Sequence, residues 1–183
     1  MKTEKISVAE ISRLREAAEI ERNTHHEVMN RISKISSVQV GFNWLPDGLP
    51  AKEQMQIVKR GNQKEIMALL TAYANLRMSS HDEERFERVN IAPEVQMYIF
   101  HQPIGFDAAR IYMLEHNRLC LDVETELIKK KMMSVIAKKR LSPKAEVFLL
   151  THCLHEGKEQ DSDLSLFPVQ EYLEKNKLSP LGQ

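Results

Sequence analysis

The chain has 183 residues, with 26 basic and 26 acidic side chains, 42% apolar residues and 6% aromatic residues. This apolar content and charge balance exclude an extensively disordered chain and argue against a protein that coats nucleic acid through a strong basic excess. Six glycines and seven prolines provide few tight turns, which disfavours a many-stranded β fold.

Targeting and membrane signals are not found in the sequence. The first twenty residues carry eight charged side chains and therefore lack the apolar core of a signal peptide. No stretch approaches the roughly 18 consecutive apolar residues that a membrane span needs. We therefore expect a cytoplasmic protein without membrane contact, in which Cys120 and Cys153 are free thiols.

Residues 1–36 are predicted to form an amphipathic N-terminal helix. Ser7 followed by Glu10 is a capping box, and neither Gly nor Pro occurs before Ser36. Apolar residues recur in steps of three and four residues, which is typical of a heptad stripe, at Ile11, Leu14, Ala18, Val28, Ile32 and Ile35. Six apolar positions on one stripe predict that another surface covers it.

That cover is either the same chain or a second copy of it. Residues 37–48 are predicted to be a linker, and its Pro46-Asp47-Gly48 turn can bring the helix back onto residues 51–75. Glu21 and His25 interrupt the stripe, so a dimer through residues 11–35 would have to bury both in its seam. We therefore favour the monomer and keep the dimer as the alternative.

Residues 49–183 are predicted to be a helical repeat domain. An apolar marker recurs before a helix start, and we expect it to be buried, at Leu49, Met78, Ile104, Leu121 and Leu141. Leu141-Ser142-Pro143 combines a staple residue, an N-cap and a first-turn proline. Glu126 and Glu146 each follow a marker by five residues, and Gly61-Asn62, His116-Asn117 and Gly157 are expected helix ends. Because helices of about ten residues are marginal alone, they must stack on their neighbours.

The segment from Leu49 to Tyr73 resembles one unit of short bacterial α-helical repeat proteins. Their unit has a Leu, an acidic residue five positions later, a Leu-Ile pair, Arg-Gly-Asn, and a second helix ending in Tyr-Ile. Here Arg60-Gly61-Asn62 occurs once, Gln54 occupies the acidic position, and later units keep only the apolar spacing. The resemblance covers residues 49–183 and implies an α-solenoid without a catalytic motif.

One cluster could hold a metal ion. His152 and His155 lie three residues apart, and Glu156 lies four residues after His152. Two histidines would supply only part of a zinc site, and the usual His-Glu-x-x-His order is absent. We interpret the cluster as the polar end of a helix, with a metal-dependent enzyme as an alternative.

Two basic runs could bind phosphate, and their members are Lys129, Lys130, Lys131, Lys138, Lys139 and Arg140. Both follow stretches that begin with acidic residues, which is the arrangement that the helix dipole favours. We therefore expect these side chains to spread around their helices instead of forming one face with aromatic neighbours.

Together these patterns predict an all-α protein, a long N-terminal helix followed by a short α-solenoid of irregular helix pairs. The expected function is binding of an as yet unnamed protein partner, without catalytic activity and without a cofactor. Phosphate or nucleic-acid binding through Lys129–Lys144 and a metal-dependent enzyme using His152 and His155 remain alternatives.

Overall fold

The computed structural model describes residues 8–36, 48–79, 90–102, 105–136, 138–139, 141–159, 172–174 and 176. Within these residues every regular element is a helix, which confirms the all-α class. The helices are α1 (Val8–Ser36), α2 (Ala51–Lys59), α3 (Gln63–Ser79), α5 (Pro93–His101), α6 (Asp107–His116), α7 (Leu121–Lys129), α8 (Met133–Ile136) and α9 (Pro143–Glu159). None of these described helices is long and apolar enough to cross a membrane.

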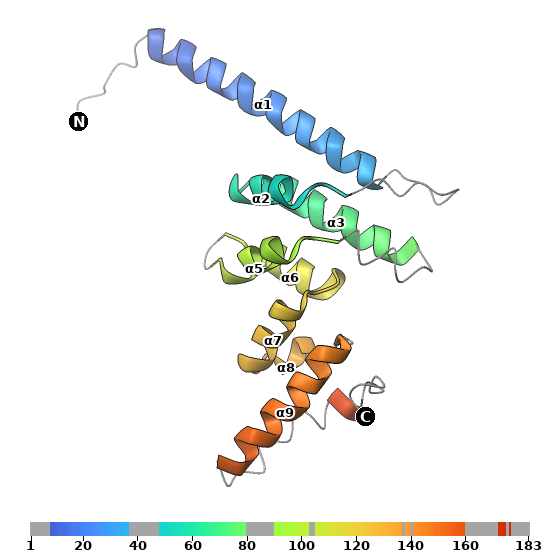
Figure 1. The fold of residues 1–183 in the computed structure, drawn as a ribbon. Coiled ribbons are helices and arrows are strands. Elements are labelled where there is room, and N and C mark those ends of the chain that lie inside the picture. Colours follow the sequence, from blue (N-terminus) through green and yellow to red (C-terminus); the bar gives the residue numbers. More distant parts are fainter. Residues whose placement is uncertain are drawn as a thin grey trace, which may run out of the picture.

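The helices follow one another through space in chain order, from α1 at one end to α9 at the other (Figure 1). We call α2 with α3 the first layer, α5 with α6 the second, and α7 with α8 the third. The helices of each layer contact each other. Contacts of α2 with α5, of α3 with α6, and of α5 with α7 join the layers, and α9 packs on α7.

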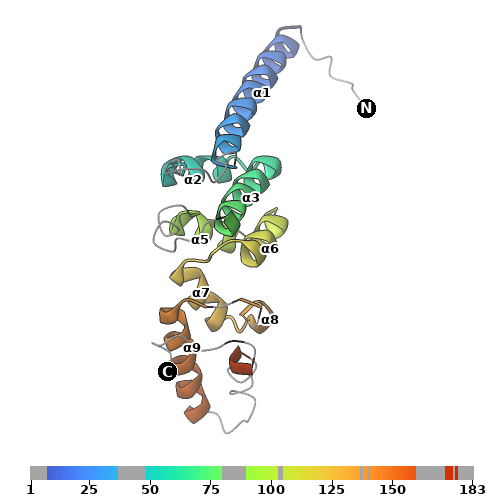
Figure 2. The ribbon, with the colours of Figure 1, turned by 90° about the vertical axis from the view of Figure 1, so that its right-hand side faces the viewer.

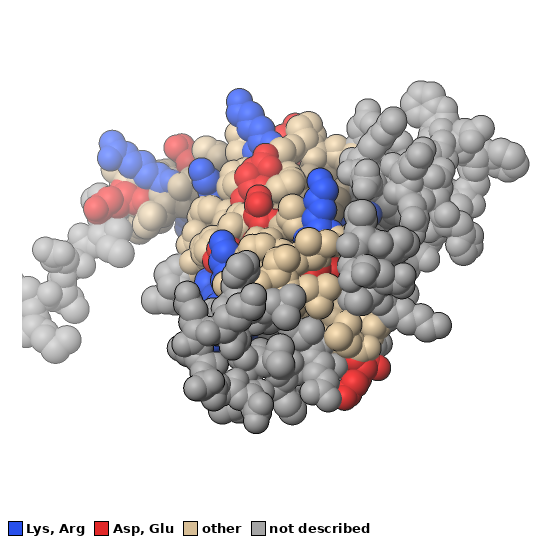
Figure 3. Space-filling model, turned by 60° about the horizontal axis from the view of Figure 1, so that its bottom comes forward, with Lys and Arg blue, Asp and Glu red and all other residues tan. Residues whose placement is uncertain are grey.

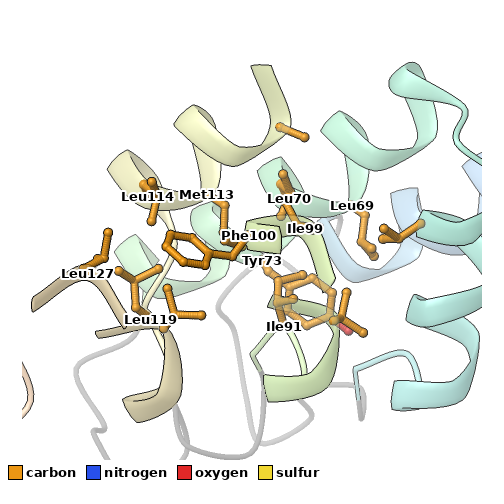
Figure 4. Packing of buried hydrophobic residues seen from close by; sticks show 14 of the residues in the cluster. Leu69, Leu70, Tyr73, Ile91, Ile99, Phe100, Met113, Leu114, Leu119 and Leu127 are labelled. Carbon is orange, nitrogen blue, oxygen red and sulfur yellow. The ribbon is translucent and has the colours of Figure 1, made fainter. Parts of the chain in front are cut away.

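Apolar side chains from successive layers form one continuous core. Figure 4 shows where α3, α5 and α6 meet, with Phe100 close to Met113 and with Leu119 and Leu127 from the next layer nearby. Helices as short as α2 and α5 gain their stability from this packing, since isolated helices of that length are marginal in water.

The turn after α2 recurs after α7. In the first layer Gly61 has φ 72°, a left-handed conformation that favours glycine, and its N–H bonds the Val58 carbonyl at 3.0 Å. Lys131 holds the equivalent place after α7 with φ 54°, and its N–H bonds the Ile128 carbonyl at 2.9 Å. A non-glycine residue in this conformation costs roughly 1–2 kcal/mol, so Lys131 occupies a place where Gly would be less strained.

The predicted burial of the apolar markers is partly wrong. Leu141 is buried, Leu49 is half-buried, and the side chains of Met78 and Ile104 lie outside the described residues. Leu121 is 39% exposed, whereas Leu119 is only 8% exposed. Leu121 is the first residue of α7, and the core instead takes Leu119, the apolar residue two positions before the helix, as it takes Ile91 before α5 and Leu141 before α9.

Further details of the repeat can be compared with the prediction. Glu126 lies within the first two turns of α7, as predicted, and is half-exposed, whereas Glu124, which follows Leu119 by five residues, is buried. Gly157 does not end a helix, since α9 continues to Glu159. The predicted start of α9 is confirmed, because the helix begins at Pro143 and Ser142 Oγ accepts a hydrogen bond from the Ala145 N–H.

The N-terminal helix is confirmed over its described length, and its stripe is half covered. Ile32 and Ile35 are each 3% exposed, and the chain that covers them is its own, because α1 packs on α3. Ile11 and Leu14 are 41% and 62% exposed. Figures 1 and 2 both show the N-terminal half of α1 projecting beyond the layers.

This difference predicts unequal effects of truncating two residues of the same stripe. Ile32→Ala should lower the free energy of unfolding by about 3 kcal/mol, because it leaves a cavity between α1 and α3. Leu14→Ala should change it by less than about 0.5 kcal/mol, because the side chain is exposed. Urea denaturation of both variants checks this. Equal losses, with a dimer mass in light scattering, would show that a second copy covers Leu14.

Candidate functional site

Three buried polar side chains connect each layer to the next. Gln54 of α2, Gln96 of α5 and Glu124 of α7 are at most 4% exposed, and each lies in the first turns of its helix. Gln54 and Gln96 each accept a hydrogen bond from the backbone N–H of the residue that precedes the first helix of the next layer. Glu124 accepts the equivalent bond from the residue that precedes α9. We call these three the bridging residues.

Their hydrogen bonds follow one pattern. Gln54 Oε1 accepts from the Ala92 N–H at 2.9 Å, Gln96 Oε1 from the Cys120 N–H at 2.8 Å, and Glu124 Oε1 from the Ser142 N–H at 3.0 Å. The two glutamines also donate to the carbonyl five residues before them, at Leu49 and Ile91. Ala92 and Cys120 occupy the N-cap positions of α5 and α7, and neither side chain makes a capping hydrogen bond. The backbone N–H of each N-cap residue is instead bonded by the neighbouring layer.

Glu124 is the ionisable member of the bridging residues. Burial raises the pKa of its carboxyl group, and the Ser142 hydrogen bonds together with the charges of Arg118 and Lys139 lower it in part. Glu124 accepts from both the N–H and the hydroxyl of Ser142. An amide would accept the first bond equally well without a buried charge.

A tyrosine hydroxyl completes the polar core at each end of the array. Tyr172 accepts from the Leu141 N–H at 3.1 Å and donates to Glu146 Oε1 at 2.9 Å. Tyr73 lies 3.3 Å from Gln54 Nε2 in the first layer, and burial raises its pKa while hydrogen bonds from Leu49 and Gln54 lower it. A Cβ on Gly48 would lie 2.6 Å from the Tyr73 hydroxyl, so only glycine allows this approach.

A second polar cluster joins α1 to the first layer. The Glu65 carboxylate, fully buried near the start of α3, lies 2.7 Å from His25 Nδ1 and 3.4 Å from an Arg60 nitrogen. Among the described residues Glu65 Oε2 has no hydrogen-bond partner. Arg31 adds an ion pair to Glu53 at 2.5 Å. His25, which interrupts the apolar stripe of α1, therefore contacts α3 of its own chain.

The first helices of the layers run in the same direction. Their N-terminal ends adjoin, because the bridging residues connect them. Their C-terminal ends adjoin as well, since the Lys59 ammonium lies 6.0 Å from the Tyr98 ring centroid and the Lys130 ammonium 4.6 Å from that of Phe100. Equivalent positions of α2, α5 and α7 therefore lie side by side.

This alignment brings the basic C-terminal residues of α2, α5 and α7 to one side of the array. The first turns of α2, α5 and α7 carry Glu53, Glu94 and Asp122, whereas their ends carry basic residues. We call the exposed set at those ends the basic edge, and its members are Lys59, Arg60, His101, Lys129, Lys130 and Lys131. Figure 3 shows the molecule from the α9 side, where the described basic and acidic side chains are intermixed. That face therefore carries no patch of a single charge.

The predicted basic runs do not act as one cluster. Lys129 and Lys130 lie over rings of different neighbours, Phe148 of α9 and Phe100 of α5, so each lysine is near an aromatic ring but the two are directed at different helices. Lys139 instead donates to the Asn117 carbonyl at the end of α6. Lys138 is exposed, and Arg140 lies outside the described residues.

The structure places His152 against an aromatic ring. Its imidazole stacks on Phe148 with centroids 5.4 Å apart, and the side chains of Cys153, His155 and Glu156 lie outside the described residues. In the part of the chain that is described, no three His, Cys, Asp or Glu side chains could hold a metal together. Cys120 is a free thiol, and burial raises its pKa.

No protein-family model matches the chain, and no curated protein or solved structure is significantly similar to it. The resemblance based on residues 49–67 is therefore supported only in its coarse implication, an all-helical protein. The family itself stays a prediction.

The buried charge of Glu124 predicts a pH-dependent stability. The pKa of Glu124 is raised in the folded state, so Glu124 contributes most to the free energy of unfolding when it is protonated. This contribution is lost as the pH rises through the folded-state pKa. Glu124→Gln should therefore be more stable than the wild type near pH 7, by roughly 1 kcal/mol, with a smaller gain near pH 4. Thermal unfolding across this pH range measures the gain.

Glu126→Gln is the matched control, because Glu126 lies on the same helix, is half-exposed and pairs with Lys129 at 3.2 Å. It should show no stabilisation that grows with pH. A Glu124→Gln variant less stable than the wild type at neutral pH would contradict the assignment of a costly buried charge.

Proposed function

We propose that this chain is a protein-binding scaffold, an α-solenoid that presents repeated surface positions to a protein partner and has no chemistry of its own. The observation that carries the proposal is the alignment of α2, α5 and α7, whose ends adjoin at both sides. Surfaces built from equivalent positions of successive repeats suit elongated partners, since each repeat can contact the next part of the same ligand.

The placement of polar groups supports a scaffold. Hydrogen bonds of the bridging residues hold each layer against the next, and the ion pair of Arg31 with Glu53 and the contact of His25 with Glu65 hold α1 on the first layer. Buried hydrogen-bonded groups of this kind fix register, so the exposed residues of separate layers keep constant spacing. A constant spacing is what recognition of an extended ligand requires.

A second candidate is binding of phosphate or nucleic acid through Lys129–Lys144. The observation that favours it is the position of Lys129 and Lys130 beside aromatic rings. Single-stranded nucleic acids are bound by cations combined with stacking rings. Phe100, however, is only 4% exposed and cannot offer a face to a base. We therefore rank this candidate below the protein-binding scaffold.

Affinity capture followed by reconstitution tests the proposed function. The tagged full chain should retain one protein in stoichiometric amount from the cells that make it, and the purified pair should form a complex of fixed stoichiometry in light scattering. Nuclease treatment should not release the partner. Retention of nucleic acid alone, sensitive to nuclease and to salt, would favour the second candidate and contradict the scaffold.

A further inference from the structure

The basic edge continues from layer to layer. Lys59 of the first layer lies over Tyr98 of the second, Phe100 of the second lies beneath Lys130 of the third, and Lys129 reaches Phe148 of α9. Each contact joins neighbouring layers, so the cations form a row along the array instead of a cluster on one helix.

Within the described residues, some cations of the basic edge form ion pairs with carboxylates of the same chain and others do not. Arg60 lies 3.4 Å from the buried Glu65 carboxylate, and Lys129 pairs with Glu126 at 3.2 Å. The ring contacts of Lys59 and Lys130 do not neutralise the ammonium charge, and both side chains are exposed. A ring beneath an ammonium also restricts the lysine, which lowers the entropy that a ligand must remove.

Lys131, another exposed member of the basic edge, occupies a strained backbone position. The equivalent turn after α2 uses Gly61, which adopts the left-handed conformation without strain, whereas Lys131 adopts it with φ 54°. The chain therefore carries a lysine where glycine would fit the backbone better. Strained backbone conformations of this kind cluster at functional sites.

We propose that the basic edge binds an extended acidic peptide segment of the protein partner. This inference rests on the proposed function and names the chemistry of the partner. Helices in contact lie about 8–10 Å apart, which corresponds to about three residues of a polyproline II chain, where every third side chain points the same way. Carboxylates repeated at every third residue would then meet the basic-edge side chains of successive layers, such as Lys59, His101 and Lys130.

The same geometry argues for a peptide over a nucleic acid. The rings beside the lysines are already occupied by them, and Phe100 is buried. Stacking of bases therefore has no free platform at Phe100, whereas carboxylates need only the exposed ammonium groups. The zero net charge of the chain is compatible with this, because the acidic first turns lie at the opposite ends of α2, α5 and α7.

The test uses the full chain and a fluorescent peptide of five Glu-Pro-Pro repeats, with fluorescence anisotropy as the measurement. We expect the peptide to bind, and the dissociation constant to rise at least about tenfold between roughly 50 and 300 mM salt. A peptide of five Lys-Pro-Pro repeats and a thymidylate strand of equal charge should bind more weakly. Tighter binding of thymidylate would assign the edge to nucleic acid and overturn the proposal.

Charge reversal locates the binding. Lys59→Glu with Lys130→Glu should weaken acidic-peptide binding at least about tenfold. The matched control, Lys138→Glu with Lys144→Glu, changes the net charge equally at exposed positions outside the edge and should change binding less than about twofold. Circular dichroism confirms that both variants are folded. Equal weakening by both pairs would show non-specific attraction and overturn the inference.

The two proposals fail separately. If the captured protein partner still binds the Lys59→Glu, Lys130→Glu variant as tightly as the wild type, the scaffold function stands and the acidic-peptide inference is wrong. If no protein partner is retained, the scaffold function itself is contradicted.

Discussion

The hydrogen bond that the backbone N–H before a helix donates to a buried side chain of the preceding layer is the interaction on which this structure depends. Helices of nine or ten residues, such as α2, α5 and α6, are too short to persist alone. Apolar packing joins them, yet it is not directional and tolerates sliding. The bridging residues Gln54, Gln96 and Glu124 each fix one backbone group of the following layer at 2.8–3.0 Å. Because a buried N–H without a partner is costly, any slip between layers would leave these groups unsatisfied.

The same constraint determines what the surface offers. Once the N-terminal ends of α2, α5 and α7 are joined, their C-terminal ends must also adjoin, and the lysine–ring contacts there show that they do. Helix-dipole preferences place acidic residues at one end of each helix and basic residues at the other. Stacking helices in the same direction therefore brings the basic C-terminal residues of α2, α5 and α7 to one edge, in a chain without any excess of either charge. The docking of α1 relies on a separate polar cluster, in which His25 and Arg60 lie against the buried Glu65 carboxylate of the first layer.

The sequence predicted the elements better than their contacts. The extent of α1, the all-α class and the start of α9 at Leu141-Ser142-Pro143 follow from local patterns, and local patterns sufficed for them. The sequence predicted Leu121 as a buried marker, but Leu119 is apolar as well, and only tertiary packing shows that the core receives Leu119. The partners of the bridging residues lie 38, 24 and 18 residues ahead in the chain, so no fixed spacing reveals them. Glutamine also carries no charge to mark a buried functional position, and the basic edge becomes visible only once the helices are stacked.

Amide hydrogen exchange measured residue by residue by NMR tests the central claim most directly. The N–H groups of Ala92, Cys120 and Ser142 precede helices and have no acceptor within their own helix. If the bridging residues hold the layers, these three amides should exchange as slowly as amides in the helix interiors, while the neighbouring first-turn amides of Glu94 and Leu121 exchange quickly. Gln96→Leu should accelerate exchange at Cys120 without unfolding the chain. Rapid exchange at all three amides in the wild type would contradict the account.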